Sequence, residues 1–347
     1  MTTLDELGGW PALLGPLMSS EHLPRAHAAA GMASILAGDA TSAQIAGFVV
    51  ALRQKGETVE ELSGLIDAVV GATDRVHLAP PLDTTAIDIV GTGGDRSHSI
   101  NISTTSMFVL AGGGVVVCKH GNRALSSSCG AGDLLEALGV NVDLGAAEVA
   151  RCVLEAGLGF CLAPRFHPGF RHAGPVRREL GVPTSFNILG PMSNPARVRR
   201  LVVGIANPGM AEKMLGVMAV HGAQRILMVH GGDGLDEMTT TGPTQTWELR
   251  DGVVTHGSVD PVALGLPLVR PEQLTGGLPE LNARLTRAVL AGDAGPHRDI
   301  VVLNAAAGFY VAGLADSLAD GLTLARESID GGHAEAAAAR LVAVSNA

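Results

Sequence analysis

The sequence predicts an α/β protein, in which a small N-terminal α-helical domain precedes a larger α/β domain with a central, mostly parallel sheet flanked by helices. Three observations support this prediction. Residues 1–75 carry only helix-type apolar spacing. A break with two prolines follows at 77–83. After it, short apolar runs alternate with Gly-rich loops and helical stretches, which is typical of strands and helices around a parallel sheet.

Three predicted helices come first. Apolar residues recur three and four positions apart in the stretches 21–38, 41–56 and 58–72. Thr41 and Thr58 precede the second and third of these helices and are predicted to be their N-caps. Glu61, three residues after Thr58, completes a capping-box pattern. No strand pattern interrupts this region, and 347 residues suffice for one large domain or two unequal ones.

The second region predicts buried strands separated by helices. The strand candidates are short apolar runs at 86–90, 114–119, 160–164, 200–206 and 225–231. The helix candidates among them are 134–139 and 209–223, and the chain returns to helix over 299–329. Two further short runs within 244–257 flank an Asp-Gly turn, which predicts an antiparallel ribbon at one edge of the sheet.

Composition excludes several classes of protein. A formal net charge of -10 argues against a broad nucleic-acid or anionic-membrane surface, so any polyanionic ligand must be captured locally. No apolar stretch approaches the roughly 20 residues of a membrane-spanning helix, and the N-terminus lacks signal-peptide features, so we expect a cytoplasmic protein. The four cysteines show no CxxC pairing and are expected to be thiols, and the histidines show no HExxH pattern.

The first loop with chemical character is GTGGD at 91–95. It follows a predicted strand, and its glycines remove side chains where phosphate oxygens could approach backbone N–H groups. Asn101, Ser103 and Thr104 then supply polar groups at the predicted start of a helix, whose N-terminus favours an anion. The loop matches neither GxGxxG nor the P-loop pattern, so a purely structural turn is the alternative.

A second loop, KHGNRALSSSCGAGD at 119–133, follows the next predicted strand. It concentrates Lys119, His120, Asn122 and Arg123 together with three serines. In an acidic protein, such a local positive charge is what capture of a phosphorylated anion requires. The alternative is a solvated basic loop.

A third loop, at 230–242, carries the adjacent carboxylates of Asp236 and Glu237. Adjacent side chains in an extended loop point apart, and such acids are often simply solvated. In a phosphate site, however, carboxylate oxygens hold Mg²⁺, which keeps waters and binds substrate phosphates. Mg²⁺ is therefore the cofactor that this loop predicts.

A fourth segment, at 165–195, is too polar for a core strand and too rich in proline for one continuous helix. It contains His167, Arg177 and Arg178. Only one of the two consecutive arginines is needed to reach a ligand carboxylate, and the other is expected to face solvent.

Together these loops resemble the anthranilate phosphoribosyltransferase family. The resemblance rests on GTGGD, NIST, KHGNR followed by SS, HPGF with VRRELG, FNILGP with NP, and GLDE, in this order along nearly the whole chain. It implies a nucleoside phosphorylase/phosphoribosyltransferase-like fold. The expected domains are 1–75, with part of about 168–195 packed against it, and 76–347. Pyrimidine nucleoside phosphorylases share the architecture, but their phosphate loop has a Lys-His-Ser pattern.

The resemblance also implies an activity. Members of this family transfer phosphoribose from phosphoribosyl pyrophosphate to anthranilate, giving N-(5-phosphoribosyl)anthranilate and pyrophosphate in tryptophan biosynthesis. They depend on magnesium, and their active site lies between the two domains. They are commonly homodimers through the helical domain. For this chain we therefore expect two small-molecule substrates, no nucleic-acid or membrane partner, and a homodimer.

Site residues follow from the resemblance, position by position. No residue is expected to act as a covalent nucleophile. Those implied for phosphoribosyl pyrophosphate are Gly91, Gly94, Asp95, Ser99, Asn101, Ile102, Ser103, Thr104, Lys119, His120, Gly121, Asn122, Arg123, Ser126 and Ser127. Those implied for anthranilate are Gly91, Asn122, His120, His167 and Arg177. Those implied for the metal are Ser103, Asp236 and Glu237.

The sequence departs from the commonest family pattern at a few positions. Ser99 stands where Thr is frequent, Cys129 and Ala131 stand where SGS is frequent, and Gly132 replaces Ala. Ser99 keeps a hydroxyl group, whereas Ala131 cannot donate a hydrogen bond. Three alternatives to the implied activity remain open: a nucleoside phosphorylase, a phosphoribosyltransferase for another aromatic acid, and a noncatalytic phosphoribose-binding subunit.

Overall fold

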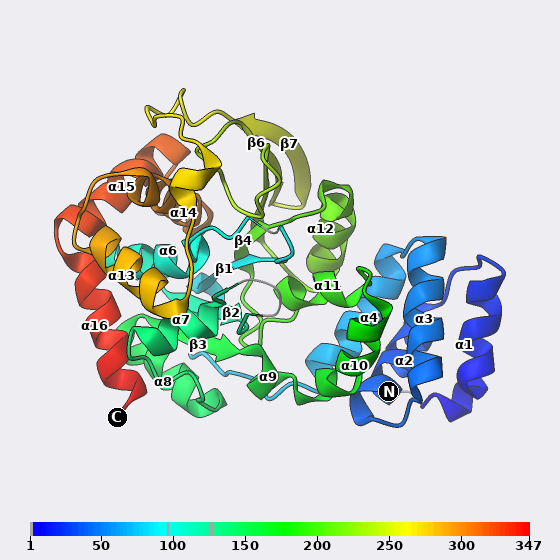
Figure 1. Cartoon of the computed structure of the whole chain (residues 1–347). Coiled ribbons are helices and arrows are strands. Elements are labelled where there is room, and N and C mark those ends of the chain that lie inside the picture. The colour runs from blue at the N-terminus through cyan, green and yellow to red at the C-terminus, as the bar shows by residue number, and fades with distance from the viewer. Residues whose placement is uncertain (1–2, 96, 125–127) are drawn as a thin grey trace.

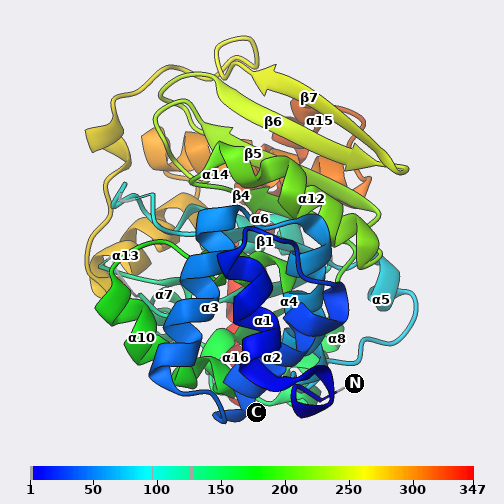
Figure 2. The same ribbon diagram turned by 90° about the vertical axis from the view of Figure 1, so that its right-hand side faces the viewer.

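The structure is a computed structural model that describes residues 3–95, 97–124 and 128–347. It confirms the predicted fold class. A bundle of N-terminal helices lies to one side of a mixed, mostly parallel sheet, and the C-terminal helices lie on the other side (Figures 1 and 2). The division of the chain near residue 75 stays a prediction.

The N-terminal bundle is built from four helices. They are α1 (Gly9–Met18), α2 (Arg25–Ala37), α3 (Ser42–Lys55) and α4 (Val59–Gly71). Helices α2 and α4 pack very closely because Gly64 has no side chain: a Cβ there would lie 2.2 Å from the Arg25 carbonyl oxygen. The sequence did not predict α1, which contains Pro16 and two glycines.

The predicted N-caps of α3 and α4 are confirmed. The Thr58 hydroxyl accepts a hydrogen bond from the Glu61 N–H at 3.1 Å, and the Glu61 carboxylate accepts one from the Thr58 N–H at 2.8 Å. Thr41 forms the same reciprocal pair with Gln44. Glu61 is fully buried and also accepts a hydrogen bond from Lys55 at 2.8 Å, so this cap joins two helices of the bundle.

We expect Thr58→Ala to lower the free energy of unfolding by about 1 kcal/mol, because it leaves the Glu61 N–H without its acceptor. Chemical denaturation followed by circular dichroism measures this change. Thr323→Ala is the matched control, since Thr323 is an exposed threonine within a helix. This substitution should change the free energy of unfolding by no more than about 0.5 kcal/mol. Equal stability of the Thr58 variant and the wild type would contradict a role for the capping box.

The described residues form a seven-stranded sheet with the order β3-β2-β1-β4-β5-β6-β7. The first five strands in this order are parallel, and β6 and β7 add an antiparallel ribbon at one edge, as predicted. The strand bounds are Ile87–Gly91 (β1), Val117–Gly121 (β2), Leu158–Leu162 (β3), Arg200–Gly204 (β4), Arg225–Gly231 (β5), Thr244–Arg250 (β6) and Val253–Val259 (β7). The second strand begins three residues later than predicted, because the Val115 N–H bonds back to the Leu110 carbonyl oxygen and closes the preceding helix.

Helices cover both faces of this sheet (Figure 1). Those of the α/β region are α5 (Leu82–Thr85), α6 (Ile102–Gly112), α7 (Ala131–Ala137), α8 (Ala146–Ala156), α12 (Ala211–Val220), α13 (Pro279–Leu290), α14 (Pro296–Ala312), α15 (Leu318–Asp330) and α16 (His333–Ser345). The segment after β3 forms only short helices, namely α9 (Ala163–Phe166), η2 (Pro168–His172), α10 (Gly174–Leu180), α11 (Phe186–Leu189) and η3 (Gly190–Met192). The sequence missed α8 and α13.

The strand order places the polar loops together. From β1 the chain builds outward through β2 and β3, and then returns to the other side of β1 with β4 and β5. In parallel sheets of this kind, ligands bind beyond the carboxyl ends of the strands, at the point where the strand order reverses. That point is between β1 and β4. Both strands end in glycine, at Gly91 and Gly204.

Two absences were also predicted. In the described part of the chain, no helix combines the length and the apolar character needed to cross a bilayer. The cytoplasmic location itself stays a prediction. None of the four cysteines is in a disulfide, and all four are buried.

Candidate active site

The acidic loop of residues 234–237 packs directly onto the glycines that end β1 and β4. A Cβ on Gly91 would lie 2.3 Å from Asp236 Oδ2, and one on Gly204 would lie 1.6 Å from the Asp236 carbonyl oxygen. Only glycine admits this approach. The bare backbone at the ends of β1 and β4 therefore has a structural purpose, because it lets a carboxylate reach the strand ends.

The predicted anion loop offers its backbone to that carboxylate. Gly93 and Gly94 have positive φ angles of 69° and 85°, a conformation that glycine adopts without strain. The Gly93 N–H donates a hydrogen bond to Asp236 Oδ2 at 2.6 Å. Asp95 lies close enough to Asp236 to raise the pKa of its carboxyl group. An amide of this loop thus already binds an anionic oxygen.

The loop continues into α6, and the prediction of a helix start there is confirmed. The Ser103 N–H, in the first turn, donates to Glu237 Oε1 at 3.2 Å. Thr104 and Ile102 are buried beneath it. Ser99 lies outside this turn, where it forms an isolated β-bridge with Thr275. Asp236 and Glu237 therefore point apart, one to each half of the anion loop, as expected for adjacent residues.

Lys119 is the cation at the centre of this arrangement. Its side chain is buried, and its ammonium group donates to the Ile89 carbonyl oxygen and, at 3.2 Å, to Ser103 Oγ. Burial lowers the pKa of Lys119, while Asp88, Glu237 and Asp236 oppose that shift. The lysine is held beside the N-terminus of α6, so both contribute positive potential at the same place.

The two carboxyl groups lie in an environment that disfavours their charges. Burial, then Asp95 and Glu237, raise the pKa of Asp236 well above its usual range. Burial raises the pKa of Glu237 to about 7, although Lys119 lowers it. Two buried carboxylates that repel each other are stabilised by a cation placed between them. The residues predicted to hold a metal therefore fit that task.

The acidic loop is held by residues that sequence reasoning missed. Asn304 of α14 is fully buried; it accepts a hydrogen bond from the Met238 N–H at 2.9 Å and donates one to the Met238 carbonyl oxygen at 2.8 Å. Asp233 accepts hydrogen bonds from the hydroxyl groups of Thr239 and Thr241. The only sequence signal for Asn304 was a lone amide in an otherwise apolar helical stretch.

The second predicted loop lies at the end of β2. Asn122 is half-buried, and Gly121 packs against the ring of Phe160. Arg123 is exposed and forms a two-pronged ion pair with Glu136, with Asp133 at 3.5 Å. In this structure its guanidinium group is thus bound to acids of α7. Ser126 and Ser127 lie outside the described residues.

A pair of histidines marks the face of the sheet opposite Lys119. The rings of His120 and His167 meet edge to face with centroids 5.0 Å apart, and both side chains are buried. His120 Nδ1 lies 3.1 Å from the Gly190 carbonyl oxygen, so it must carry the proton. His120 Nε2 is then a buried lone pair, without a partner in the described structure. Such an atom can accept a hydrogen bond from a ligand.

Burial keeps both imidazoles neutral. It lowers the pKa of His120 to about 3, with the neighbouring His167 as a further cause, and it lowers the pKa of His167 to about 4. Well above the ordinary pKa of about 6.5, both histidines are neutral in the folded and in the unfolded chain. As the pH falls through 6.5 toward the folded pKa values, the unfolded chain takes up protons and the folded chain does not, so the free energy of unfolding falls. Asp88 acts in the opposite direction, since burial raises its pKa to about 6.

Comparison with a variant isolates the histidine contribution. Between pH 6.5 and pH 5 we expect the wild type to lose about 1.6 kcal/mol more unfolding free energy than His120→Asn, since a pKa near 3 lies well below this window. Urea denaturation at each pH measures both proteins. Parallel curves for the two proteins over this window would show that His120 is not held neutral by the fold.

Arg177 is the half-buried member of the arginine pair, and Arg178 is the exposed one. The guanidinium carbon of Arg177 lies 5.3 Å from the centre of the Phe186 ring, and burial lowers the pKa of Arg177. Among the described residues, no carboxylate forms an ion pair with Arg177. A half-buried arginine with this environment is suited to a planar anion such as a benzoate.

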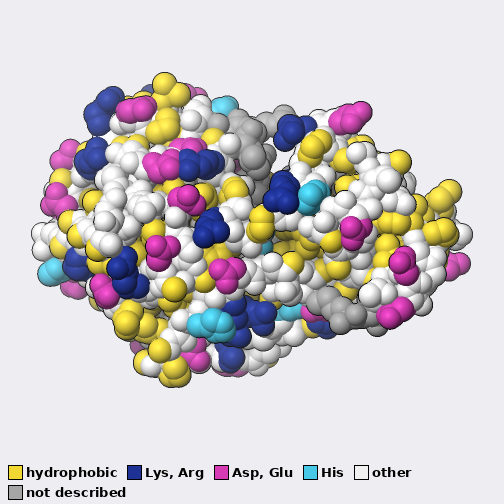
Figure 3. All heavy atoms as spheres, turned by 90° about the horizontal axis from the view of Figure 1, so that it is seen from below, with side chains coloured by type: hydrophobic (Ala, Val, Ile, Leu, Met, Phe, Trp, Pro, Cys, Tyr) yellow, Lys and Arg dark blue, Asp and Glu magenta, His cyan; other side chains and the backbone are white. Residues whose placement is uncertain are grey.

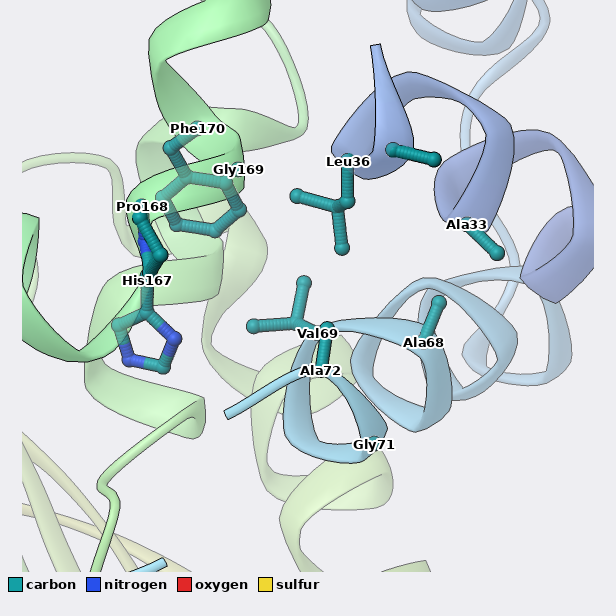
Figure 4. Close-up of a pocket in the computed structure, with 11 residues that line it drawn as sticks. Ala33, Leu36, Ala68, Val69, Gly71, Ala72, His167, Pro168, Gly169 and Phe170 are labelled. Carbon is teal, nitrogen blue, oxygen red and sulfur yellow. The ribbon is translucent and has the colours of Figure 1, made fainter. Parts of the chain in front are cut away.

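A cavity of about 370 Å³ lies beside this histidine pair rather than at the phosphate loops. Figure 4 shows Leu36 of α2 and Val69 of α4 facing His167 and Phe170 across it. Its lining is mostly apolar, and His167 is the residue that it shares with the predicted site. Thr73 Oγ1 lies 2.9 Å from His167 Nδ1 and fixes the ring at the edge of this cavity.

The surface carries no broad basic patch on the face seen in Figure 3. There, Lys and Arg side chains are interspersed with Asp and Glu. The cations of the predicted site are less accessible: Lys119 is buried and Arg177 is half-buried.

Comparisons with known proteins show to which family the chain belongs. A family model described as the glycosyl transferase family a/b domain matches residues 83–335, and the helical bundle domain of the same family matches residues 11–72. The anthranilate phosphoribosyltransferase of Salinispora arenicola is 50% identical over 343 residues, covering 97% of both chains. The chain belongs to the anthranilate phosphoribosyltransferase family.

Solved structures of anthranilate phosphoribosyltransferases have the same fold. The enzyme of Thermus thermophilus is 40% identical, with a TM-score of 0.90 over 96% of this chain and 99% of that one. The enzyme of Saccharomyces cerevisiae, in complex with PRPP and Mg, is 28% identical, with a TM-score of 0.87 over 97% and 98% of the two chains. The recognition of the family from the loop motifs is therefore confirmed.

The structure shows the surroundings of two departures from the usual motif of anthranilate phosphoribosyltransferases. Cys129 packs in a small cluster with Leu134 and Ala283, and its thiol donates to the Gly130 carbonyl oxygen at 3.6 Å. Gly132 is tightly packed, since a Cβ there would lie 3.1 Å from a methyl group of Leu162. Nothing in the structure explains Ala131.

Proposed function

We propose that this chain transfers phosphoribose from 5-phosphoribosyl 1-pyrophosphate to anthranilate, giving N-(5-phosphoribosyl)anthranilate and pyrophosphate in tryptophan biosynthesis. One observation carries the proposal: the glycine loop, the start of α6, Lys119 and the acidic pair meet at the point where the strand order reverses. Such a site combines anion donors with metal ligands, as a diphosphate requires.

Mg²⁺ is the cofactor of the proposed reaction. Asp236, Glu237 and the Ser103 hydroxyl would hold it, because their oxygens are hard donors and the two carboxylates are buried without enough neutralising charge. Bound there with the diphosphate, it would supply charge neutralisation for the leaving group. The same two carboxylates accept hydrogen bonds from the N–H groups of Gly93 and Ser103.

The chain's own groups stabilise the departing diphosphate. As the bond between the anomeric carbon and the pyrophosphate oxygen breaks, negative charge grows on the leaving oxygens. Lys119, the N–H groups of the glycine loop and the first-turn hydroxyls of α6 are positioned before the reaction, so they offset this charge without reorganising. No covalent intermediate with the protein is needed.

The acceptor lies on the opposite side of the anomeric carbon in this proposal. Arg177 pairs with the anthranilate carboxylate, and Asn122, Gly91, His120 and His167 line the remaining edge. The neutral His120 accepts a hydrogen bond from the aryl amine through Nε2 and thereby orients the nitrogen lone pair toward the ribose. Positioning is the main requirement, since the aryl amine is already neutral at physiological pH.

We further propose a homodimer through the N-terminal helices. The family resemblance supports this assembly, and Met18 of α1, 83% exposed, and Val50 of α3, 43% exposed, are apolar side chains on these helices that a second copy would cover. Sedimentation equilibrium of the purified protein tests this assembly. A monomer at micromolar concentration would contradict it.

One assay tests the proposed reaction most directly. Purified protein is mixed with anthranilate, phosphoribosyl pyrophosphate and Mg²⁺, and the loss of anthranilate fluorescence is followed. Phosphorolysis of a nucleoside by inorganic phosphate would favour a nucleoside phosphorylase instead. Transfer to a substituted benzoate but not to anthranilate would favour another acceptor, and ligand binding without pyrophosphate release would favour a noncatalytic subunit.

A further inference from the structure

A buried asparagine on α13 joins three segments around the phosphate side of the site. Asn282 is 1% exposed, and its Oδ1 accepts a hydrogen bond from the Gly277 N–H at 2.7 Å. Its Nδ2 donates to Asn101 Oδ1 at 2.8 Å. The Asn101 amide nitrogen in turn donates to the Cys129 carbonyl oxygen at 3.0 Å. We call these three hydrogen bonds the relay; it runs from the turn before α13 to the second loop, residues 119–133.

This relay determines what Asn101 can do. Asn101 is the N-cap residue of α6, yet its side chain does not cap the helix. Because both ends of its amide are engaged by Asn282 and Cys129, the side chain is held across the helix start. The N–H groups of the first turn stay available to an anion, and one of them already binds Glu237.

The same relay fixes the position of the helix start. A Cβ on Gly276 would lie 2.6 Å from Asn282 Oδ1 and 3.0 Å from both Ile100 Cα and the Ser99 carbonyl oxygen. The turn before α13 is thus packed tightly onto the segment that leads into α6. One turn further along α13, the Thr286 hydroxyl meets that of Thr105 at 3.0 Å. Helix α13 therefore supports α6 from outside the predicted site.

Asn282 also touches the second loop through Cys129. Burial raises the pKa of the Cys129 thiol to about 11, and a hydrogen bond with the Asn282 side chain opposes this shift. The Asn282 amide thus contacts both the start of α6, through Asn101, and the segment that follows Asn122 and Arg123, through Cys129.

We propose that Asn282 is a positioning residue for the phosphoribosyl pyrophosphate half of the site, acting through Asn101 and the Cys129 carbonyl group. The proposal rests on the proposed function and names a residue of the same site that no loop motif contains. Asn282 does not touch substrate. It holds two loops at the spacing that the diphosphate and ribose require, and errors of about 1 Å in such spacing are costly.

Two substitutions separate its contacts. Asn282→Asp keeps an acceptor for the Gly277 N–H but removes the donor to Asn101, whereas Asn282→Ala removes both. Ser328→Ala is the matched control, because it deletes a buried hydrogen bond of 2.7 Å to the Val109 carbonyl oxygen at the far end of α6. For each protein, KM is measured for both substrates. Calorimetry measures the Kd for phosphoribosyl pyrophosphate with Mg²⁺ in the absence of anthranilate, and thermal denaturation gives Tm.

We expect both Asn282 variants to raise the KM and Kd for phosphoribosyl pyrophosphate by roughly fivefold to tenfold, the effect of a lost hydrogen bond, with the KM for anthranilate changed by less than about twofold. Ser328→Ala should lower Tm and leave both affinities unchanged. Unchanged affinity in both Asn282 variants would overturn the proposal. So would a normal affinity in Asn282→Asp alone, since the role would then be confined to the Gly277 turn.

A measurement on the wild type supports the test if a variant does not fold. Hydrogen exchange of the segment 274–286 should slow when phosphoribosyl pyrophosphate and Mg²⁺ bind, although this segment lies outside the predicted contacts. Unaltered exchange there would also overturn the proposal. A wild type that binds phosphoribosyl pyrophosphate but does not consume anthranilate would contradict the proposed acceptor, and the calorimetric comparison would still decide the role of Asn282.

Discussion

Replacing the two adjacent acids of the third loop, with Asp236→Asn and Glu237→Gln, is expected to raise the Mg²⁺ concentration for half-maximal activity by about a hundredfold. The amides keep the shape of the side chains, and their carbonyl oxygens can still accept from the Gly93 and Ser103 N–H groups. What they lose is charge, which an oxygen site for Mg²⁺ needs. The initial rate of anthranilate consumption as a function of Mg²⁺ concentration measures the effect.

The same variant should be more resistant to thermal unfolding than the wild type when no substrate is present. Because both carboxyl groups have raised pKa values in the fold, their charged forms oppose folding at neutral pH and above. Asp251→Asn is the control, because it removes the charge of a carboxylate that is 92% exposed in the turn between β6 and β7. Unchanged magnesium dependence in the double variant would refute the assignment of the acidic pair.

Arg177→Ala is expected to lower kcat/KM for anthranilate. The loss corresponds to about 1.5–3 kcal/mol of transition-state stabilisation, the scale of a lost charged hydrogen bond. The KM for phosphoribosyl pyrophosphate should stay close to that of the wild type. The physical reason is the place of Arg177, which stacks near Phe186 on the helical side and lies apart from the contacts of Lys119 with Ser103. Steady-state kinetics with each substrate varied in turn measures the split.

Arg178→Ala provides the control for this prediction. It removes the neighbouring guanidinium group, which is exposed, from the same short helix α10. Its kinetic constants should match the wild type within about twofold, since exposed charges contribute little. Equal weakening of both substrates in Arg177→Ala would count against a role in binding the anthranilate carboxylate.

Much of the local structure could be predicted because short-range rules determine it. Thr41 and Thr58 cap α3 and α4 because their hydroxyl groups lie three residues before the N–H groups they bind. The turn between β6 and β7 has Asp251 at φ 52° and Gly252 at φ 78°, the positive angles that an Asp-Gly pair favours in a two-residue hairpin. Helix α13 was missed although Pro279 at its start and buried residues at three- and four-residue spacing are local helix signals; only its support of the site depends on distant contacts.

The sequence by itself determined the fold class, the order of the polar loops, the family and the residue types available for binding a diphosphate. Each of these depends on neighbours within a few positions or on motif order. The tertiary structure alone decided which residues these side chains contact. Asp236 reaches Gly93 across 143 residues, Asn282 reaches Asn101 across 181, and Arg123 pairs with Glu136 on α7. Such contacts depend on how strands and helices pack, and a local sequence pattern does not show which distant residues come together.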